Sequence, residues 1–250
     1  MIVLNDTSSR TQGPSGLRRP VVMITGTDTG VGKTIATAAL ASALAGFGAV
    51  AVYKPVQTGV VSGESGDVDE VRRLSGVHEA TSGMSLRKPL APVPAAALEG
   101  VGLPTISEHA ARIASLHEKA EWVLVEGSGG VLVELDSVGG TIADIGRFLS
   151  GDYGVTVVAV IVVRAGLGTL NHTALTVEAL DRRGIAIAAV VIGSWPDQPD
   201  TIEVTNREHL ARTHALDALP GGAAQLEPAR FRSAAVGWLP GVLAGVGATS

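Results

Sequence analysis

The chain alternates short, uniformly apolar runs with longer segments in which apolar residues recur every three or four positions. The apolar runs have the length and composition of buried strands and lie at 21–24, 49–53, 122–126, 155–163 and 185–192. Helical spacing predicts helices from 33 to about 45, 69–74, 107–119, 141–149, 170–183 and near 202–216. Strands that are apolar on both faces and alternate with helices predict an α/β fold, with a mostly parallel central sheet and helices on both faces.

Three segments lack this pattern. Residues 1–20 are rich in polar residues, Gly and Pro, and we expect a flexible leader there, followed by a single domain over 21–250. Four prolines within 84–104 predict an irregular connection. Beyond about residue 216 the chain is rich in Gly, Ala and Pro, and we assign no element there.

Composition and charge exclude several function classes. Hydrophobic residues make up 46% of 250, which is enough for a core, and the net charge of −5 argues against a nucleic-acid or membrane-surface binder. The uncharged stretch 34–53 is mostly Ala and is interrupted by glycines, so we interpret it as helix, break and strand rather than a membrane span. The absence of cysteine excludes disulfides and thiolate chemistry and fits the cytoplasm, where we expect the protein.

A glycine-rich turn links the first predicted strand to the first helix. Its glycines let backbone N–H groups turn inward as an anion cradle, and the helix N-terminus adds partial positive charge. Lys33 can reach the β- and γ-phosphates of a nucleotide, and the Thr34 hydroxyl can ligate Mg²⁺. The standard spacing has glycine where Thr27 stands, but the context predicts a P-loop NTPase-type fold. The expected nucleotide contacts are Gly26, Thr27, Asp28, Thr29, Gly30, Val31, Gly32, Lys33 and Thr34.

Charged residues near the ends of other strands complete a magnesium–nucleotide site. Glu126 precedes a glycine-rich turn, where a carboxylate can hold Mg²⁺ or a metal-bound water. Asp67 or Asp69 can reach the metal; alternatively, Asp67 caps the following helix. Lys54 ends the second strand and can stabilise a transferring phosphoryl group, and Thr58 can donate to an anion or only stabilise its turn.

The turn after the fourth predicted strand offers a second anion site. It spans 166–172 and opens a helix, so its backbone N–H groups and Asn171 can bind an anion. The plainer alternative is that Thr169 only caps the helix. We expect His172 to be a hydrogen-bonded structural residue rather than a general base.

In chain order, these motifs resemble the dethiobiotin synthetases, ATP-dependent carboxylases of biotin biosynthesis that close a ureido ring. The resemblance covers roughly residues 21–225. The P-loop is shared widely, whereas Lys54-Pro-Val and Leu167-Gly-x-x-Asn-His172 are more discriminating. The matching segments are 25–34, 53–59, 123–130 and 167–172.

The resemblance implies a reaction and its participants. One amine of 7,8-diaminononanoate (diaminopelargonate) takes up CO₂, supplied as bicarbonate, to give a carbamate. The carbamate attacks the γ-phosphate of Mg-ATP, and the second amine closes the ring on the mixed anhydride, releasing phosphate. ATP is the expected co-substrate, although other nucleoside triphosphates are not excluded. No covalent enzyme nucleophile is needed.

The resemblance also implies residue roles. Lys33, Lys54 and Thr29 lie beside the reacting groups, and Thr58 contacts the carbamate and phosphoryl group. Magnesium is held by Thr34, Asp67 and Glu126, with Asp67 favoured over Asp69. Ala91 and Pro92 line the aliphatic chain of the diaminononanoate substrate. The carboxylate of this substrate is bound across a homodimer interface by Gly168, Thr169, Leu170 and Asn171. Contacts to the nucleobase side are expected from Gly193, Ser194, Pro220 and Gly222.

Some positions depart from the family pattern, and two other classes of protein fit this sequence less well. Gly30 stands where some relatives carry Glu, and Arg164 and Gly166 replace other residues in the second turn. Residues 193–197 lack the Asn-Asp pair that reads adenine in some members, so we expect loose nucleobase selectivity. A partitioning or septum-placement ATPase would start its P-loop with Lys-Gly-Gly, and a cobyrinate-type amidation synthase would need a glutaminase domain; neither feature is found here.

Overall fold

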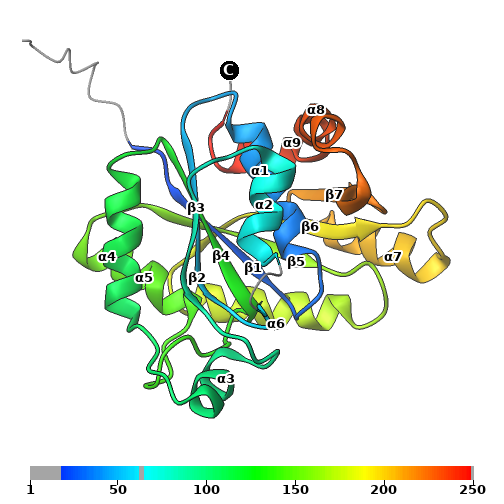
Figure 1. Cartoon of the computed structure of the whole chain (residues 1–250). Helices are drawn as coiled ribbons and strands as arrows, with labels where there is room; N and C mark the ends of the chain where they lie inside the picture. The colour runs from blue at the N-terminus through cyan, green and yellow to red at the C-terminus, as the bar shows by residue number, and fades with distance from the viewer. Residues whose placement is uncertain (1–17, 62–64, 249–250) are drawn as a thin grey trace, which may run out of the picture.

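The computed structural model describes residues 18–61 and 65–248 (Figure 1). The predicted leader lies outside these residues except for 18–20. In that remnant the Arg19 guanidinium stacks 5.0 Å from the ring centroid of Trp122.

Seven parallel strands form one sheet within the described residues, in the order β3-β2-β4-β1-β5-β6-β7. Central β1 is wholly buried because both neighbours and helices on both sides cover it. The predicted α/β fold of the P-loop NTPase type is therefore confirmed. The strands are β1 Val21–Gly26, β2 Val50–Gln57, β3 Ala80–Ser85, β4 Trp122–Gly130, β5 Val157–Val163, β6 Ala186–Trp195 and β7 Leu216–Pro220.

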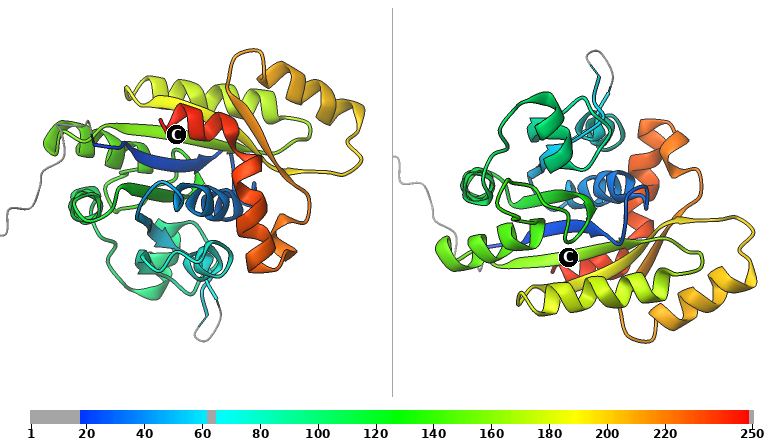
Figure 2. Two further views of the ribbon diagram at one scale, coloured as in Figure 1. Left: turned by 90° about the horizontal axis from the view of Figure 1, so that it is seen from above. Right: turned by 90° about the horizontal axis from the view of Figure 1, so that it is seen from below.

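Helices lie on both sides of the sheet and bury two separate apolar cores (Figure 2). One core joins the sheet to α1 Lys33–Leu44, α2 Asp67–Ser75, α8 Pro228–Trp238 and α9 Pro240–Gly245. The other joins it to α3 Pro92–Glu99, α4 Ile106–His117, α5 Ile142–Asp152, α6 Thr169–Asp181 and α7 Thr201–Leu210. Alternate strand residues face the two cores, as expected for a sheet covered on both sides. None of the helices within the described residues is long and apolar enough to cross a membrane.

Two predictions about elements were wrong, and the end of the chain, to which no element was assigned, contains two α-helices. The segment 84–104 was expected to be irregular but contains the end of β3 and all of α3, because Pro92 and Pro94 sit in the first turn of α3, where a missing N–H is tolerated. The helix expected over 202–216 ends at Leu210, and β7 begins at Leu216. The Gly/Ala-rich end forms α8 and α9, which pack against the sheet through Phe231 and Val242.

A buried polar pair holds β2 against α4. The Tyr53 hydroxyl and His109 Nδ1 lie 2.8 Å apart, and both side chains are buried. Burial lowers the pKa of His109 to about 4 and raises that of Tyr53 to about 12. His109 is therefore neutral in the folded chain at pH 7 and takes up a proton more readily when unfolded.

The free energy of unfolding should consequently fall on acidification in a way that depends on His109. The folded pKa lies below the usual 6.5, so its contribution is present above pH 6.5 and is lost as the pH falls toward 4. Between pH 7 and 5 we expect the wild type to lose about 2 kcal/mol more stability than His109→Gln in urea denaturation. Exposed His78→Gln is the control and should lose as much as the wild type; equal losses in wild type and His109→Gln would contradict the prediction.

Candidate functional site

A cavity of about 580 Å³ opens where the P-loop, the ends of β2 and β4 and the start of α2 meet. This is the carboxyl end of the central strands, where ligands bind in open α/β sheets. The described residues that line it are Thr29, Gly30, Gly32, Lys33, Thr34, Lys54, Thr58, Asp67, Pro89, Leu90, Ala91, Pro92, Glu126, Ser128, Gly129 and Val133. The structure thus brings together five of the nine predicted loop residues, the carboxylates Asp67 and Glu126, Lys54, Thr58 and the Ala91–Pro92 turn. The other four loop residues, Gly26, Thr27, Asp28 and Val31, do not line the cavity.

The P-loop connects β1 to α1 through two glycines in the left-handed region. Gly30 has φ 73° and Gly32 has φ 98°, conformations that other residues rarely adopt. Lys33 Nζ donates to the carbonyl of Asp28 at 2.9 Å, so the lysine folds back over its own loop. Burial, reinforced by the nearby charge of Lys54, lowers the pKa of Lys33 to about 8. The loop therefore presents an anion cradle with a buried ammonium group beside it.

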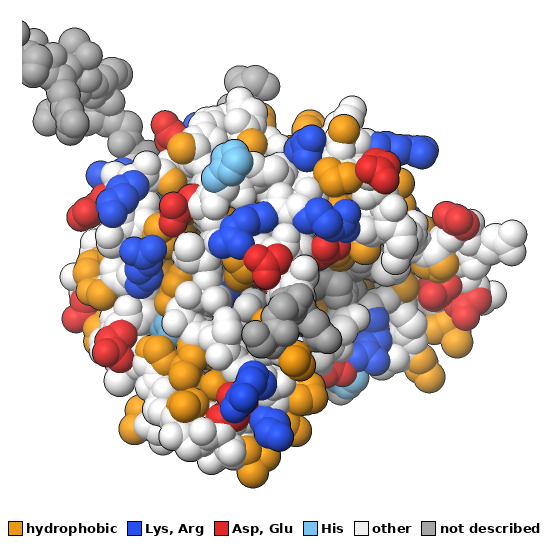
Figure 3. Space-filling view, in the orientation of Figure 1, with side chains coloured by type: hydrophobic (Ala, Val, Ile, Leu, Met, Phe, Trp, Pro, Cys, Tyr) orange, Lys and Arg blue, Asp and Glu red, His pale blue; other side chains and the backbone are white. Residues whose placement is uncertain are grey.

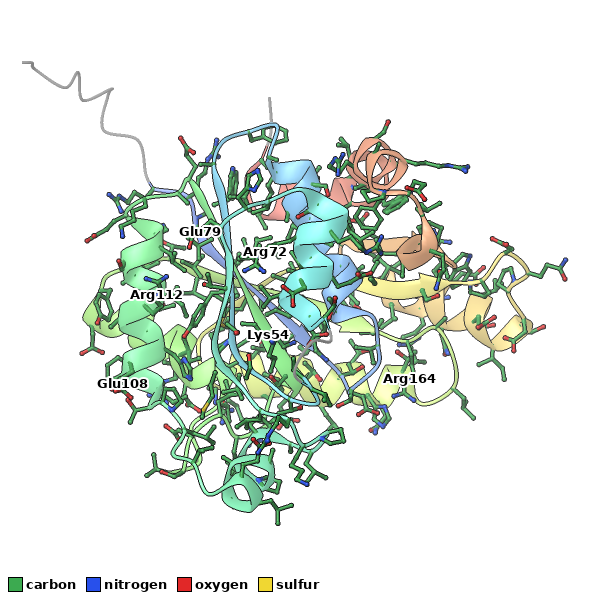
Figure 4. The ribbon with its side chains drawn as sticks, in the orientation of Figure 1. Lys54, Arg72, Glu79, Glu108, Arg112 and Arg164 are labelled. Carbon is green, nitrogen blue, oxygen red and sulfur yellow. The ribbon has the colours of Figure 1, made fainter. Side chains whose placement is uncertain are left out.

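Lys54 (Figure 4) forms the centre of a charged cluster in which Lys54 and Glu126 are buried and the Asp67 side chain is 43% exposed. Its Nζ lies 2.6 Å from Asp67 Oδ2 and 2.7 Å from Glu126 Oε1. The Thr34 hydroxyl lies 3.1 Å from Asp67 Oδ1 and 2.9 Å from Glu126 Oε1. Burial alone would lower the pKa of Lys54, but Glu126 and Asp67 outweigh it and raise the pKa, so the lysine stays charged. Burial would likewise raise the pKa of Asp67, but the ammonium beside it lowers the pKa.

The two candidate aspartates have different places. Asp69 turns back to the start of α2, where its Oδ2 accepts from the Gly66 amide at 3.0 Å and its Oδ1 accepts from Arg72. Asp67 instead faces Thr34 and Lys54. Helix capping is therefore done by Asp69, and Asp67 is the aspartate in the cavity.

Gly193, expected to contact the nucleotide, lies directly behind the P-loop. A Cβ placed on it would lie 1.9 Å from the Val31 carbonyl oxygen and 2.9 Å from Val162 Cγ1. A Cβ on Gly32 would in turn lie 2.8 Å from the Gly193 oxygen. The loop and the end of β6 thus approach each other backbone to backbone. Of the other residues expected on the nucleobase side, Ser194 and Gly222 are exposed and Pro220 is half-buried; none of the four lines the cavity.

Gly193→Ala should therefore displace the P-loop. We expect weaker nucleotide binding, by about tenfold, and a loss of about 1–3 kcal/mol in the free energy of unfolding, because the added methyl group overpacks a rigid contact. Gly151→Ala is the control, since a Cβ there meets nothing within 4 Å. Calorimetric titration with ATP and urea denaturation measure both effects. Wild-type affinity and stability in Gly193→Ala would show that the loop does not depend on this contact.

The second predicted anion site lies outside the cavity. Gly168, Thr169, Leu170 and Asn171 form the start of α6, after a loop that leaves the end of β5. Gly168 has φ 90° and precedes the helix, and the Thr169 hydroxyl has no hydrogen-bond partner among the described residues. Helix capping by this hydroxyl, the plainer alternative, is therefore not observed, and the helix has no side-chain cap.

Two contacts at or beside the cavity, made by Ser128 and Arg164, were not predicted from the sequence. Ser128 donates to the carbonyl of Val56 and joins β4 to β2 at the cavity wall. Arg164 Nη2 lies 2.5 Å from Asp28 Oδ2 and ties the end of β5 to the P-loop (Figure 4). Asp28 also accepts from the Thr29 amide, which lowers its pKa, with a smaller contribution from Arg164. The glycine-rich turn after Glu126 was the available signal for Ser128; nothing in the local sequence pairs residues 28 and 164.

Comparisons with known proteins give consistent relatives. A family model described as an AAA domain matches residues 21–222. A protein of Mycobacterium avium named ATP-dependent dethiobiotin synthetase BioD is 47% identical over 87% of this chain and 94% of its own length. A protein of the same name from Rhodococcus jostii is 43% identical, with the same coverage.

Among solved structures, the cell division ATPase MinD of Pyrococcus furiosus is similar in fold. The match covers 91% of this chain and 95% of that one, with a TM-score of 0.52 and 15% identity. At this identity the likeness concerns the fold alone. It agrees with the parallel sheet and the P-loop of this chain.

Proposed function

The chain belongs to the ATP-dependent dethiobiotin synthetases, ligases of biotin biosynthesis, and we propose that its cavity binds 7,8-diaminononanoate, CO₂ and ATP and forms dethiobiotin, ADP and phosphate. The observation that carries the proposal is the meeting of two ammonium groups, Lys33 and Lys54, in one cavity. Lys33 belongs to the phosphate-binding loop, whereas Lys54 comes from β2 and is not part of that loop. Lys54 is paired here with Asp67 and Glu126. When Mg²⁺ takes these two carboxylates, the ammonium would be free for a second anion, which in this reaction is the carbamate.

The residues act by holding charge at fixed places. A carbamate oxygen attacks the γ-phosphorus, the bond from that phosphorus to the β-phosphate oxygen breaks, and ADP leaves. Lys33 neutralises charge on the terminal phosphates, and Lys54 holds the carbamate and the phosphoryl group, with Thr29 and Thr58 as further donors from the cavity wall. The second amine then attacks the carbamate carbon and expels phosphate. Positioning and charge neutralisation suffice, because no bond to the enzyme forms.

The donor set near Lys54 fits Mg²⁺ carried by the nucleotide. Thr34, Asp67 and Glu126 offer oxygen ligands, which Mg²⁺ prefers, and the Thr34 hydroxyl lies 3.1 Å from Asp67 Oδ1 and 2.9 Å from Glu126 Oε1. No group of three or more His, Asp or Glu within the described residues could enclose a metal ion. A site with two carboxylates leaves coordination positions for phosphate and water, as Mg²⁺ sites in such enzymes do. The ion would neutralise phosphate charge.

The rest of the substrate fits the apolar mouth of the cavity and a second subunit. Leu90, Ala91 and Pro92 line the cavity, and apolar side chains gather over the α3 region at the bottom of Figure 3. The residues proposed to bind the substrate carboxylate start α6 and would serve the partner's cavity in a homodimer. The side chains of Leu167 and Leu175 flank these residues and are 80% and 58% exposed. Exposed apolar side chains of this kind are expected where a second subunit would cover them. Light scattering should give twice the chain mass of 25.3 kDa; a monomer would contradict the shared site.

An assay of ADP release tests the function. With the wild type, ADP formation should require both 7,8-diaminononanoate and bicarbonate, and dethiobiotin should form in equal amount. Repeating the assay with CTP and GTP measures the expected loose nucleobase selectivity. ADP formation that does not respond to the diamine would contradict the proposal.

A further inference from the structure

We propose that Asn206 is a positioning residue that aims the backbone amides of the turn between β5 and α6 at the carboxylate of the substrate. Asn206 lies on α7, 40 residues from this turn, and is buried. The inference rests on the proposed function and extends it, since it adds a residue and two backbone amides to the acid-binding turn.

Asn206 fixes two consecutive carbonyls. Its Nδ2 donates to the Ala165 oxygen at 2.9 Å and to the Gly166 oxygen at 3.1 Å. Every peptide bond in the described residues is trans, so each N–H points away from the carbonyl of the preceding residue. Turning both carbonyls toward α7 therefore turns the N–H groups of Gly166 and Leu167 away from it.

The amides released in this way have no partner. Within residues 18–61 and 65–248, no acceptor forms a hydrogen bond with the N–H groups of Gly166, Leu167, Gly168, Leu170 or Asn171. A helix start alone explains those of Gly168, Leu170 and Asn171 and leaves those of Gly166 and Leu167. Two side-chain atoms at the same place also lack partners and are buried, the Thr169 hydroxyl and His172 Nδ1. Unsatisfied buried polar atoms are costly, and an anion that accepts from several donors would satisfy them.

The turn is held firmly enough to act as such a site. On one side Asn206 holds its carbonyls; on the other Arg164 is paired with Asp28 of the P-loop. The position of Asn206 on α7 is itself fixed, because the guanidinium of Arg207, the next residue, stacks 4.7 Å from the ring centroid of Trp195. Asn206 touches neither the cavity nor the reacting groups, so its effect should be confined to the acid end of the substrate.

Kinetics with two diamines test the inference. Asn206→Asp cannot donate to either carbonyl and should raise the KM for 7,8-diaminononanoate about tenfold while leaving the KM for ATP unchanged. Nonane-2,3-diamine keeps both amines and has a methyl group in place of the carboxylate, so its KM should not change. Thr205→Ala is the matched control, because its hydroxyl bonds only within α7. An unchanged KM for the natural diamine, or an equal rise for both diamines, would overturn the inference.

Amide NMR gives a second readout that does not need turnover. Titration of the wild type with nonanoate should shift the Gly166 and Leu167 amide signals, and Asn206→Asp and Asn206→Ala should abolish the shifts. Wild-type signals that do not move would overturn the inference. Failure of the proposed function would show differently, as a wild type that forms no ADP with the diamine.

Discussion

Lys54→Met is expected to lower kcat for dethiobiotin formation by about a thousandfold. Methionine keeps the length and apolar stem of the side chain and removes only the ammonium group. That group lies 2.6 and 2.7 Å from two carboxylates, and we propose that it is the cation that holds the carbamate. The negatively charged carbamate and the transferring phosphoryl group would then approach each other without a cation to neutralise their repulsion.

Nucleotide binding should survive this change. Lys33 and the loop amides remain, and the carboxylates of Asp67 and Glu126 are no longer neutralised by a lysine, which favours a divalent cation between them. The Kd for Mg-ATP from calorimetry should therefore stay within a few-fold of the wild-type value. Lys119→Met, an exposed site, is the control. Near-normal kcat in Lys54→Met, or the loss of nucleotide binding instead of turnover, would refute the division of roles.

Lys33→Met, unlike Lys54→Met, should weaken nucleotide binding. We propose that the loop to which this lysine belongs holds the terminal phosphates, so we expect the Kd for Mg-ATP to rise about a hundredfold, as charged hydrogen bonds to the phosphates are lost. Turnover should fall with it. An ATP affinity close to that of the wild type would show that Lys33 does not face the phosphates.

The low pKa of Lys33 adds a pH signature to this prediction. Burial lowers it to about 8, so the free enzyme carries the charge at pH 7 and loses it as the pH rises to 9. ATP affinity of the wild type should fall over that range, because binding must then first protonate the lysine. The affinity of Lys33→Met should stay flat, and Lys54 should not contribute, since its pKa is raised.

Much of this architecture could be predicted because it depends on local pattern. Strands buried on both faces leave long apolar runs, and a P-loop needs its glycines and lysine in sequence, so β1, β2, β4, β5 and β6 and the loop were found. The edge strand β3 has a weaker pattern, since it is only partly buried, and the prolines of α3 gave a breaker signal although they occupy the first helical turn.

The remaining site features depend on contacts between distant residues. Asp67 and Asp69 are chemically alike, and only the fold shows that Asp69 turns toward the helix start while Asp67 faces Lys54. The backbone contact of Gly193 with Val31 and the bonds of Asn206 to the β5–α6 turn join segments that are far apart in sequence. Such contacts are set by the packing of whole elements, so no local motif marks them.

Transfer of an oxygen atom from CO₂ to phosphate tests the central claim most directly. If a carbamate oxygen attacks the γ-phosphorus, the phosphate that ring closure releases carries one oxygen that came from CO₂. A single turnover with ¹⁸O-labelled bicarbonate, ATP and 7,8-diaminononanoate, followed by mass spectrometry of the phosphate, should show one ¹⁸O per phosphate. Phosphate without label, formed together with dethiobiotin, would contradict the account.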